Sequence, residues 1–95
     1  MNWMLNLSWE IEVTEKAVKQ IKKLGATDSK RISDYLRNRI APLDHPRQLG
    51  KPLQGSELGS YWRYRVGDYR ILCELHDDEL VVLVIEAGHR RKIYG

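Results

Sequence analysis

Three arginines are spaced at short, regular intervals around a Gly-Asp pair in the second half of the chain. Arg63 and Arg65 precede Gly67 and Asp68, and Arg70 follows them. A Gly-Asp pair is one of the short connections that β-hairpins favour, and residues two apart on a strand point to the same face. Guanidinium groups on one rigid face suit phosphate, because each offers a planar fork of donors and stays charged in proteins. The spacing therefore predicts an anion-binding surface on a hairpin.

The turn also predicts which residues face each other. With Gly67 and Asp68 as the loop, Arg65 lies opposite Arg70, and like charges in that position destabilise a sheet unless something compensates. A bound anion would compensate, whereas the alternative is a solvated strand face without a ligand. The opposed pair favours the binding site. The other face of the hairpin is predicted to enter the core, and it carries Trp62, Tyr64, Val66, Tyr69, Ile71 and Cys73.

The C-terminal residues form a second group of candidates. His89 and Arg90 follow Gly88, and Tyr94 comes soon after them. Strict alternation along this strand puts His89 on the face of Arg70, whereas a bulge at Gly88 would change which of His89 and Arg90 points there. The sequence leaves both arrangements open.

The remaining pattern predicts the elements that position these groups. Apolar and acidic residues alternate in a first strand, apolar residues then recur at helical spacing in two segments, and a loop rich in Pro and Gly leads into the hairpin. We expect an α+β domain of order β-α-α-β-β-β, with one further strand possible, in which a two-helix hairpin packs on one face of a twisted, mainly antiparallel sheet. The predicted elements are a strand at 9–13, a helix from the N-cap Thr14 to Gly25, a helix from residue 27 or 28 to Pro42, a loop at 42–59, the hairpin at 61–75 and a strand at 80–85.

Length and composition limit what the chain can be. Its 95 residues suit one domain spanning 1–95, with a net charge of +3. The single cysteine, Cys73, rules out an internal disulfide and fits a reducing compartment. No segment reaches the roughly 20 apolar residues of a membrane span, and no signal peptide pattern is present, so we expect a cytoplasmic protein. Three scattered histidines and one cysteine predict neither a metal site nor a cofactor.

Several of these motifs together resemble the RelE/ParE toxin superfamily of bacterial toxin-antitoxin pairs. They are Leu53-Gln54-Gly55 after the helices, the Tyr61–Arg65 strand, the Asp68-Tyr69-Arg70 turn and the ending from Gly88 to Tyr94. The resemblance covers nearly the whole chain and implies a RelE-like fold. In the RelE-like branch it implies an endoribonuclease that cuts mRNA in the ribosomal A site without a metal ion. The 2′-hydroxyl attacks the adjacent phosphate, which gives a 2′,3′-cyclic phosphate and a free 5′-hydroxyl.

The resemblance also implies roles for individual residues. Arg63 and Arg65 match two basic residues, usually lysines in relatives, that contact the phosphate. Because an arginine stays protonated, it is a poor general base, so the proton acceptor is expected to be Tyr94 or His89. Arg70 is expected to stabilise charge in the transition state. The implied catalytic set is Arg70, Arg90, Tyr94 and His89, the substrate-binding set is Arg63, Arg65, Tyr61 and Lys51, and no metal ligand is expected.

Partners follow from the same resemblance. It implies a RelB-like antitoxin that wraps the helices and covers the cationic face, with operator DNA reached only through that antitoxin. The other implied partners are mRNA and the A site of the 30S ribosomal subunit, with no membrane. The alternative is a ParE-like protein of the same fold that inhibits DNA gyrase and has no nuclease activity. A third reading is a relative that binds RNA with steep salt dependence but cuts nothing. The number of basic residues on the predicted sheet face favours the RelE-like reading.

Overall fold

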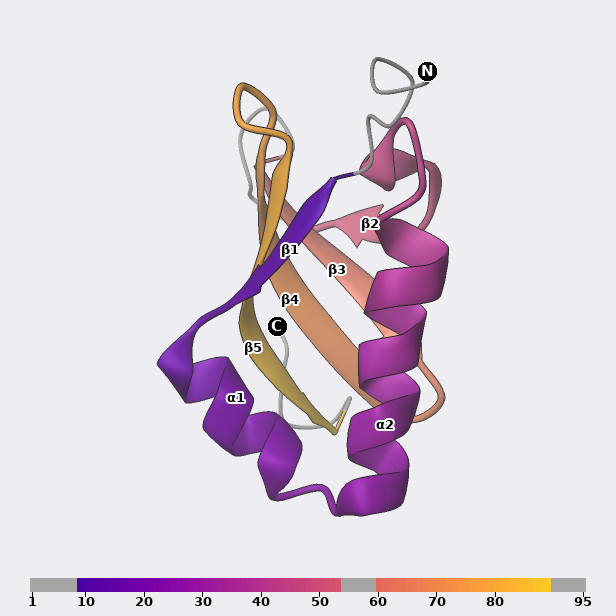
Figure 1. The fold of residues 1–95 in the computed structure, drawn as a ribbon, viewed down its shortest axis with the longest axis vertical. Helices are drawn as coiled ribbons and strands as arrows, with labels where there is room; N and C mark the ends of the chain where they lie inside the picture. Colours follow the sequence, from indigo (N-terminus) through magenta and orange to yellow (C-terminus); the bar gives the residue numbers. More distant parts are fainter. Residues whose placement is uncertain (1–8, 54–59, 90–95) are drawn as a thin grey trace, which may run out of the picture.

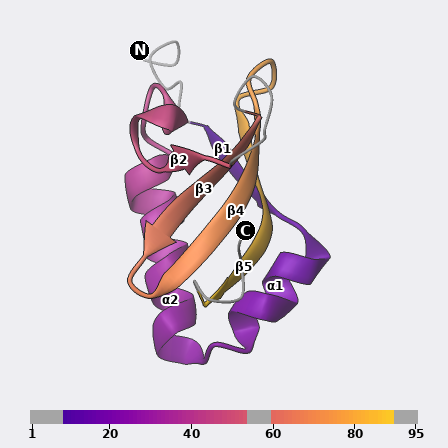
Figure 2. The same cartoon turned by 180° about the vertical axis from the view of Figure 1, so that it is seen from behind.

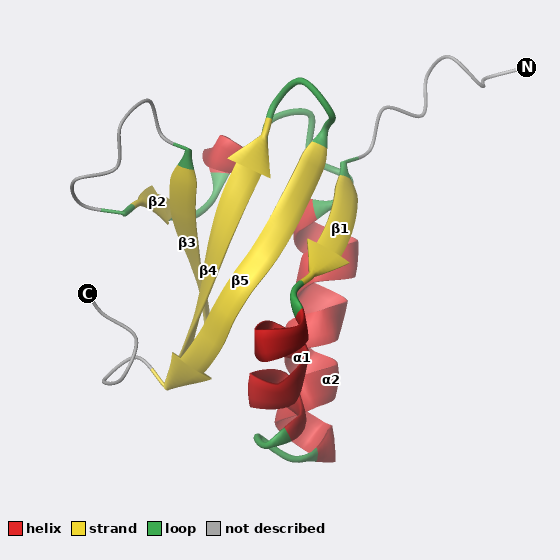
Figure 3. Ribbon diagram, turned by 90° about the vertical axis from the view of Figure 1, so that its left-hand side faces the viewer, coloured by secondary structure: helices red, strands yellow, loops and turns green. Residues whose placement is uncertain are grey.

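Two α-helices and five strands make up the part of the chain that the structure describes (Figure 1). The structure is a computed structural model that describes residues 9–53 and 60–89. Both helices lie on the same side of the sheet (Figure 3). The elements in chain order are β1 (Glu10–Val13), α1 (Glu15–Lys22), α2 (Ala26–Tyr35), β2 (Lys51–Pro52), β3 (Tyr61–Val66), β4 (Tyr69–His76) and β5 (Val81–His89).

The strands form one sheet in the order β1-β5-β4-β3-β2. β1 runs parallel to β5, and every other neighbouring pair is antiparallel. The parallel pair arises because α1, α2 and the hairpin separate β1 from β5 in the chain, which leaves room for a crossover. The predicted α+β class is confirmed, with two helices against a mainly antiparallel sheet, and the first strand takes the predicted place at an edge.

The hairpin has the predicted register. Val66 pairs with Tyr69 and Arg65 pairs with Arg70, with Gly67 and Asp68 between them. Gly67 has φ 61°, a conformation that costs glycine little because it has no Cβ. A Cβ there would also stand 2.8 Å from an Arg31 guanidinium nitrogen. The backbone angle therefore favours glycine at this turn, whereas the Arg31 side chain is flexible and could move away from a Cβ.

A bulge in β5 determines which face of the sheet Gly88 and His89 point to. Leu72 pairs with Glu86, but the next residue of β4, Cys73, pairs with Val84, so Ile85 is the extra residue. An extra residue shifts the alternation of side chains by one position. As a result, His89 pairs with Tyr69, and Gly88 pairs with Arg70. The bulge lies at Ile85 and not at Gly88, where the sequence suggested it.

The helices begin and end close to the expected residues. Thr14 is the N-cap of α1, because its hydroxyl accepts the N–H of Ala17 at 3.2 Å. Gly25 has φ 94° and connects the helices. α2 continues into a π-helical turn, Leu36–Ile40, in which the Ala41 N–H donates to the Leu36 carbonyl at 2.9 Å. The helical segment thus stops just before Pro42, as predicted, because proline cannot donate the next backbone hydrogen bond.

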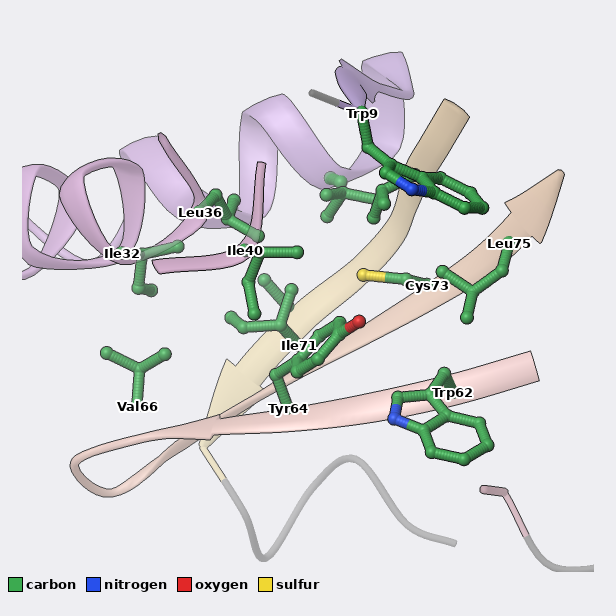
Figure 4. Packing of buried hydrophobic residues seen from close by; sticks show 14 residues of the cluster. Trp9, Ile32, Leu36, Ile40, Trp62, Tyr64, Val66, Ile71, Cys73 and Leu75 are labelled. Atoms are coloured by element: carbon green, nitrogen blue, oxygen red, sulfur yellow. The ribbon is translucent and has the colours of Figure 1, made fainter. Parts of the chain in front are cut away.

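The core lies between α2 and the hairpin (Figure 4). Ile32, Leu36 and Ile40 recur every fourth residue, and all three are buried against the sheet. From the hairpin, the predicted inward residues Trp62, Tyr64, Val66, Ile71 and Cys73 are buried in the same cluster. Burial raises the pKa of the Cys73 thiol, so this cysteine acts as a small apolar side chain and not as a nucleophile.

The segment at 42–59 is more ordered than the predicted loop where the structure describes it. A 3-10 turn at Pro46–Gln48 precedes β2. The Tyr64 hydroxyl donates to the Pro46 carbonyl at 2.8 Å, and the Trp62 indole N–H donates to the Leu49 carbonyl at 2.7 Å. These two hydrogen bonds hold residues 46–49 against β3. A strand of two residues has no periodicity of its own, so the sequence pattern could not reveal β2.

Candidate anion-binding and catalytic site

The sheet face that points away from the helices is turned toward the viewer in Figure 2. The register places four basic residues of β2, β3 and β4 on this face. Arg65 lies opposite Arg70 across the hairpin, and Lys51 lies opposite Arg63 across β2 and β3. Directly paired residues point to the same face of a sheet, and Arg63 and Arg65 are two apart on one strand. We call Lys51, Arg63, Arg65 and Arg70 the arginine face.

The arginine face carries charge that its surroundings do not neutralise. A pocket of about 250 Å³ is lined by all four basic residues, with Tyr35, Gly50 and Tyr64 completing its wall. None of the four forms an ion pair with another described residue, although Lys16, Lys30, Arg31 and Arg47 elsewhere in the described chain do. Arg65 donates only a long 3.5 Å bond from Nε to the Gly67 carbonyl. The arginine face is therefore a candidate anion-binding surface.

Tyr61 occupies the far end of the same face. It lies opposite Glu74, and a hydrogen bond to the Glu74 carboxylate raises the pKa of Tyr61. The same carboxylate lies 2.9 Å from Nε2 of His76. Tyr61 is 37% exposed, so solvent reaches part of its side chain. This end of the face is polar and partly acidic, unlike the cationic end near the turn.

His89 does not join the arginine face. Because of the bulge, it lies opposite Tyr69, and the two rings meet edge to face with centroids 6.1 Å apart. The Tyr69 hydroxyl donates to Asp28 of α2 at 2.8 Å, and this bond raises the pKa of Tyr69. His89 is thus held on the helix side of the sheet. The other two C-terminal candidates, Arg90 and Tyr94, lie outside the described residues.

Sequence reasoning missed two residues of the pocket. Tyr35 stands within the helical repeat of Ile32, Leu36 and Ile40, and nothing in the sequence sets it apart from an ordinary helix residue. Gly50 has φ 74°, and a Cβ there would stand 2.4 Å from the Arg63 carbonyl oxygen. Because the sequence does not predict β2, the close approach of Gly50 to β3 could not be inferred from the sequence either.

Neither a cluster of metal-binding side chains nor a membrane-spanning helix is found in residues 9–53 and 60–89. No group of three or more His, Cys, Asp or Glu side chains there is arranged to hold a metal ion. No helix there is both long enough and apolar enough to cross a bilayer. The basic side chains of the arginine face can bind and polarise an anion.

Comparison with known proteins identifies the family and the fold of this chain. The family model for the ParE toxin of type II toxin-antitoxin systems matches residues 11–94, which is most of the chain. The chain belongs to this toxin family. It is the toxin of a toxin-antitoxin system, and the predicted membership of the RelE/ParE superfamily is confirmed.

Similar proteins within the superfamily include RelE toxins. The mRNA interferase toxin RelE of Escherichia coli is 27% identical over 86 residues, which cover 90% of this chain and 87% of the relative. A RelBE toxin-antitoxin complex from Mycobacterium tuberculosis shares the fold with a TM-score of 0.76 at 24% identity, covering 87% of this chain and 92% of that one. A RelB-RelE complex from Methanococcus jannaschii matches with a TM-score of 0.64 at 28% identity, covering 87% and 94%.

Proposed function

We propose that this toxin is a ribosome-dependent endoribonuclease that cleaves mRNA in the A site. The observation that carries the proposal is the arginine face, where four cations without described counter-ions line one pocket formed by β2 and the β3–β4 hairpin. A relative at 27% identity is named an mRNA interferase. RNA presents a phosphodiester and, beside it, the 2′-hydroxyl that can act as an internal nucleophile.

The face supplies the electrostatic part of that reaction. When the 2′-hydroxyl attacks the adjacent phosphorus, negative charge develops on the phosphorane oxygens, and the bond to the 5′-oxygen breaks to leave a cyclic phosphate. Arg70 and Arg63 are half-buried and Arg65 is exposed. The pocket is therefore open to an RNA strand, while the β-sheet holds the basic side chains in place. Fixed cations aimed at developing charge lower the barrier, because they need no reorganisation during the reaction.

Proton transfer has to come from another group. A guanidinium has no lone pair that accepts a proton in this pH range, and His89 packs against Tyr69 on the helix side of the sheet. We therefore place proton transfer on Tyr94, with Arg90 as a further phosphate contact. These two roles rest on the resemblance to RelE-like toxins, because both residues lie outside the described residues.

The proposal includes an antitoxin and a cellular location. Solved structures similar to this chain include toxin-antitoxin complexes with RelB-like partners. We propose that a RelB-like antitoxin with an acidic or amphipathic segment covers the arginine face and wraps the helices, and that it alone contacts operator DNA. The toxin would then act in the cytoplasm, where ribosomes and mRNA are found. Co-purification of the two proteins after their joint expression tests the partner, and a toxin tolerated by its host without one would contradict it.

Primer extension on an mRNA in a purified translation system tests the activity. We expect new 3′ ends inside A-site codons only when the mRNA is on ribosomes, and intact product when the same mRNA is free. A folded protein that leaves ribosome-bound mRNA intact would contradict the proposal. Gyrase-dependent DNA damage on expression, with intact mRNA, would instead support the ParE-like alternative.

A further inference from the structure

The pocket extends beyond the arginine face to the edge of the sheet. Its wall includes Tyr35, which belongs to α2 and not to the sheet, together with Gly50, which precedes β2. The pocket therefore combines basic side chains with aromatic ones. None of the roles given above to the arginine face uses Tyr35.

The outer edge of β3 is open beside this pocket. Leu53 donates its N–H to the Tyr61 carbonyl, and Lys51 pairs with Arg63. Backbone groups of alternate residues point the same way along a strand, so those of Arg65 also point to the β2 side. No described strand pairs with Arg65 there, because β2 pairs only with Trp62 and Arg63. The backbone N–H of Arg65 is thus a further donor at the mouth of the pocket.

Tyr35 combines an aromatic surface with a hydrogen-bonding group. Its ring is half-buried, with its centroid 6.4 Å from that of Tyr64, and the Arg39 guanidinium lies 5.8 Å from its centroid. Burial raises the pKa of Tyr35 despite the nearby Arg39, so the hydroxyl carries its proton at neutral pH. No hydrogen bond joins this hydroxyl to another group in residues 9–53 and 60–89, and no fully buried polar side-chain atom there lacks a partner. The hydroxyl therefore reaches solvent and is available to a ligand in the pocket.

We propose that this pocket seats one nucleotide of single-stranded RNA, with its base against Tyr35 and its phosphate on Lys51, Arg63 and the edge of β3 at Arg65. The inference rests on the proposed function and adds a specificity-determining residue to it. Proteins recognise single-stranded RNA by packing unstacked bases on aromatic rings and on arginine planes. The volume of about 250 Å³ is below the roughly 300–1,000 Å³ of pockets that hold drug-sized ligands. One base fits that size better than a longer segment would.

The path of the strand follows from the same geometry. Cations on the sheet face hold the backbone, while a ring on α2 contacts a base, so the RNA crosses the edge of β3 between β2 and the hairpin turn. The base nearest Tyr35 is then recognised by packing against the Tyr35 ring and by a hydrogen bond with the Tyr35 hydroxyl. Such a contact favours some bases over others without excluding any, because every base has an aromatic face.

Two substitutions at Tyr35 separate the ring from the hydroxyl. Tyr35→Leu keeps an apolar contact with Tyr64 but removes the aromatic surface, and Tyr35→Phe removes only the hydroxyl. The probes are four short 2′-O-methyl RNAs, each of a single base type, which cannot be cleaved because the nucleophile is blocked. Fluorescence anisotropy at low salt measures binding, since phosphate contacts are strongest there. Thermal unfolding confirms that each variant is folded.

We expect Tyr35→Leu to weaken RNA binding by about 5- to 100-fold, the range for loss of a base–aromatic contact. Tyr35→Phe is expected to keep most of the affinity and to change the order of preference among the four bases. Arg63→Ala and Arg37→Ala form a matched pair, because each removes one guanidinium charge. Arg63 lines the pocket, whereas Arg37 lines a separate, mainly apolar groove. Only Arg63→Ala should weaken binding markedly.

Several outcomes would overturn the inference. They are wild-type affinity of a folded Tyr35→Leu protein, equal effects of the two arginine substitutions, and no measurable binding by the wild type at low salt. Cleavage assays separate this test from that of the function. If the wild type cuts ribosome-bound mRNA and Tyr35→Leu cuts it at the same sites and rate, the pocket inference fails and the function stands. If the wild type cuts nothing but binds RNA through Tyr35, the function fails and the pocket inference stands.

Discussion

Arg65 and Arg70 lie directly opposite each other across the β3–β4 hairpin, and neither forms an ion pair with another described residue. Directly opposed like charges destabilise a sheet, and cross-strand pairs contribute roughly 0.2–1 kcal/mol in either direction. The fold would therefore be at least as stable with one of these charges removed. Because the opposed arginines do not stabilise the fold, we expect that they serve to bind an anionic ligand.

Removal of Arg70 should affect activity and stability differently. We predict that Arg70→Ala lowers cleavage of ribosome-bound mRNA by about 100- to 1,000-fold, the usual cost of losing one group that stabilises transition-state charge. The free energy of unfolding should stay within about 0.5 kcal/mol of the wild type or rise, because a surface charge is lost beside another of the same sign. Primer extension and urea unfolding measure the two quantities.

Lys30→Ala is the matched control for lost charge. Lys30 is exposed on α2 and pairs with Asp34 at 2.8 Å, away from the pocket. The Lys30→Ala variant should cleave mRNA at nearly the wild-type rate, although its net charge falls by the same amount as that of Arg70→Ala. Undiminished cutting by a folded Arg70→Ala protein would refute the catalytic role of the arginine face. An equal loss of cleavage in both variants would mean that only the overall charge of the protein matters, and not the position of Arg70.

The two C-terminal candidates for proton transfer should behave differently. His89 packs on Tyr69 on the helix side of the sheet, so we predict that His89→Gln keeps cleavage within a few-fold of the wild type. Tyr94→Phe removes only a hydroxyl, and it should lower the rate of cleavage by about 100-fold or more, the scale of general acid–base catalysis. Single-turnover cleavage on ribosomes compares them. A larger loss for His89→Gln than for Tyr94→Phe would reverse the assignment.

The hairpin could be predicted in detail because its turn chemistry and its alternation agree. Gly67 and Asp68 fix the loop, and the inward residues are apolar at every second position, so one register satisfies both signals. The bulge at Ile85 could not be predicted, since it lies in a run that is apolar at every position and carries no alternation to interrupt. Tyr35 joins the pocket only through the packing of α2 against β3, which is a tertiary relationship.

A buried hydroxyl links β3 to the 3-10 turn before it. Tyr64 donates to the Pro46 carbonyl at 2.8 Å, and its burial raises the pKa of this hydroxyl. Tyr64→Phe leaves the Pro46 carbonyl without this partner, and we predict a loss of about 1–2 kcal/mol in the free energy of unfolding. Urea unfolding should show a lower midpoint with an unchanged m-value. Wild-type stability of Tyr64→Phe would mean that water replaces the bond.

An ion pair between the 3-10 turn and the β4–β5 turn should make stability depend on pH. Arg47 donates two bonds to Asp77, at 2.8 and 3.1 Å, and the hydrogen bond to Arg47 lowers the pKa of the Asp77 carboxyl. The native state therefore binds a proton at Asp77 less readily than the unfolded state, where an aspartate has a pKa of about 3.9. Stabilisation by this pair is present above that pH and is lost as the pH falls through the lower native value.

Asp77→Asn removes the charge and tests this dependence. At neutral pH we predict a loss of no more than about 1 kcal/mol, since the pair is partly exposed to solvent. The difference between variant and wild type should shrink as the pH falls below about 4 and vanish where Asp77 is protonated in both states. Urea unfolding at a series of pH values from neutral to strongly acidic measures it. A difference that stays constant or grows in acid would show that the Asp77 carboxylate does not stabilise the fold through its charge.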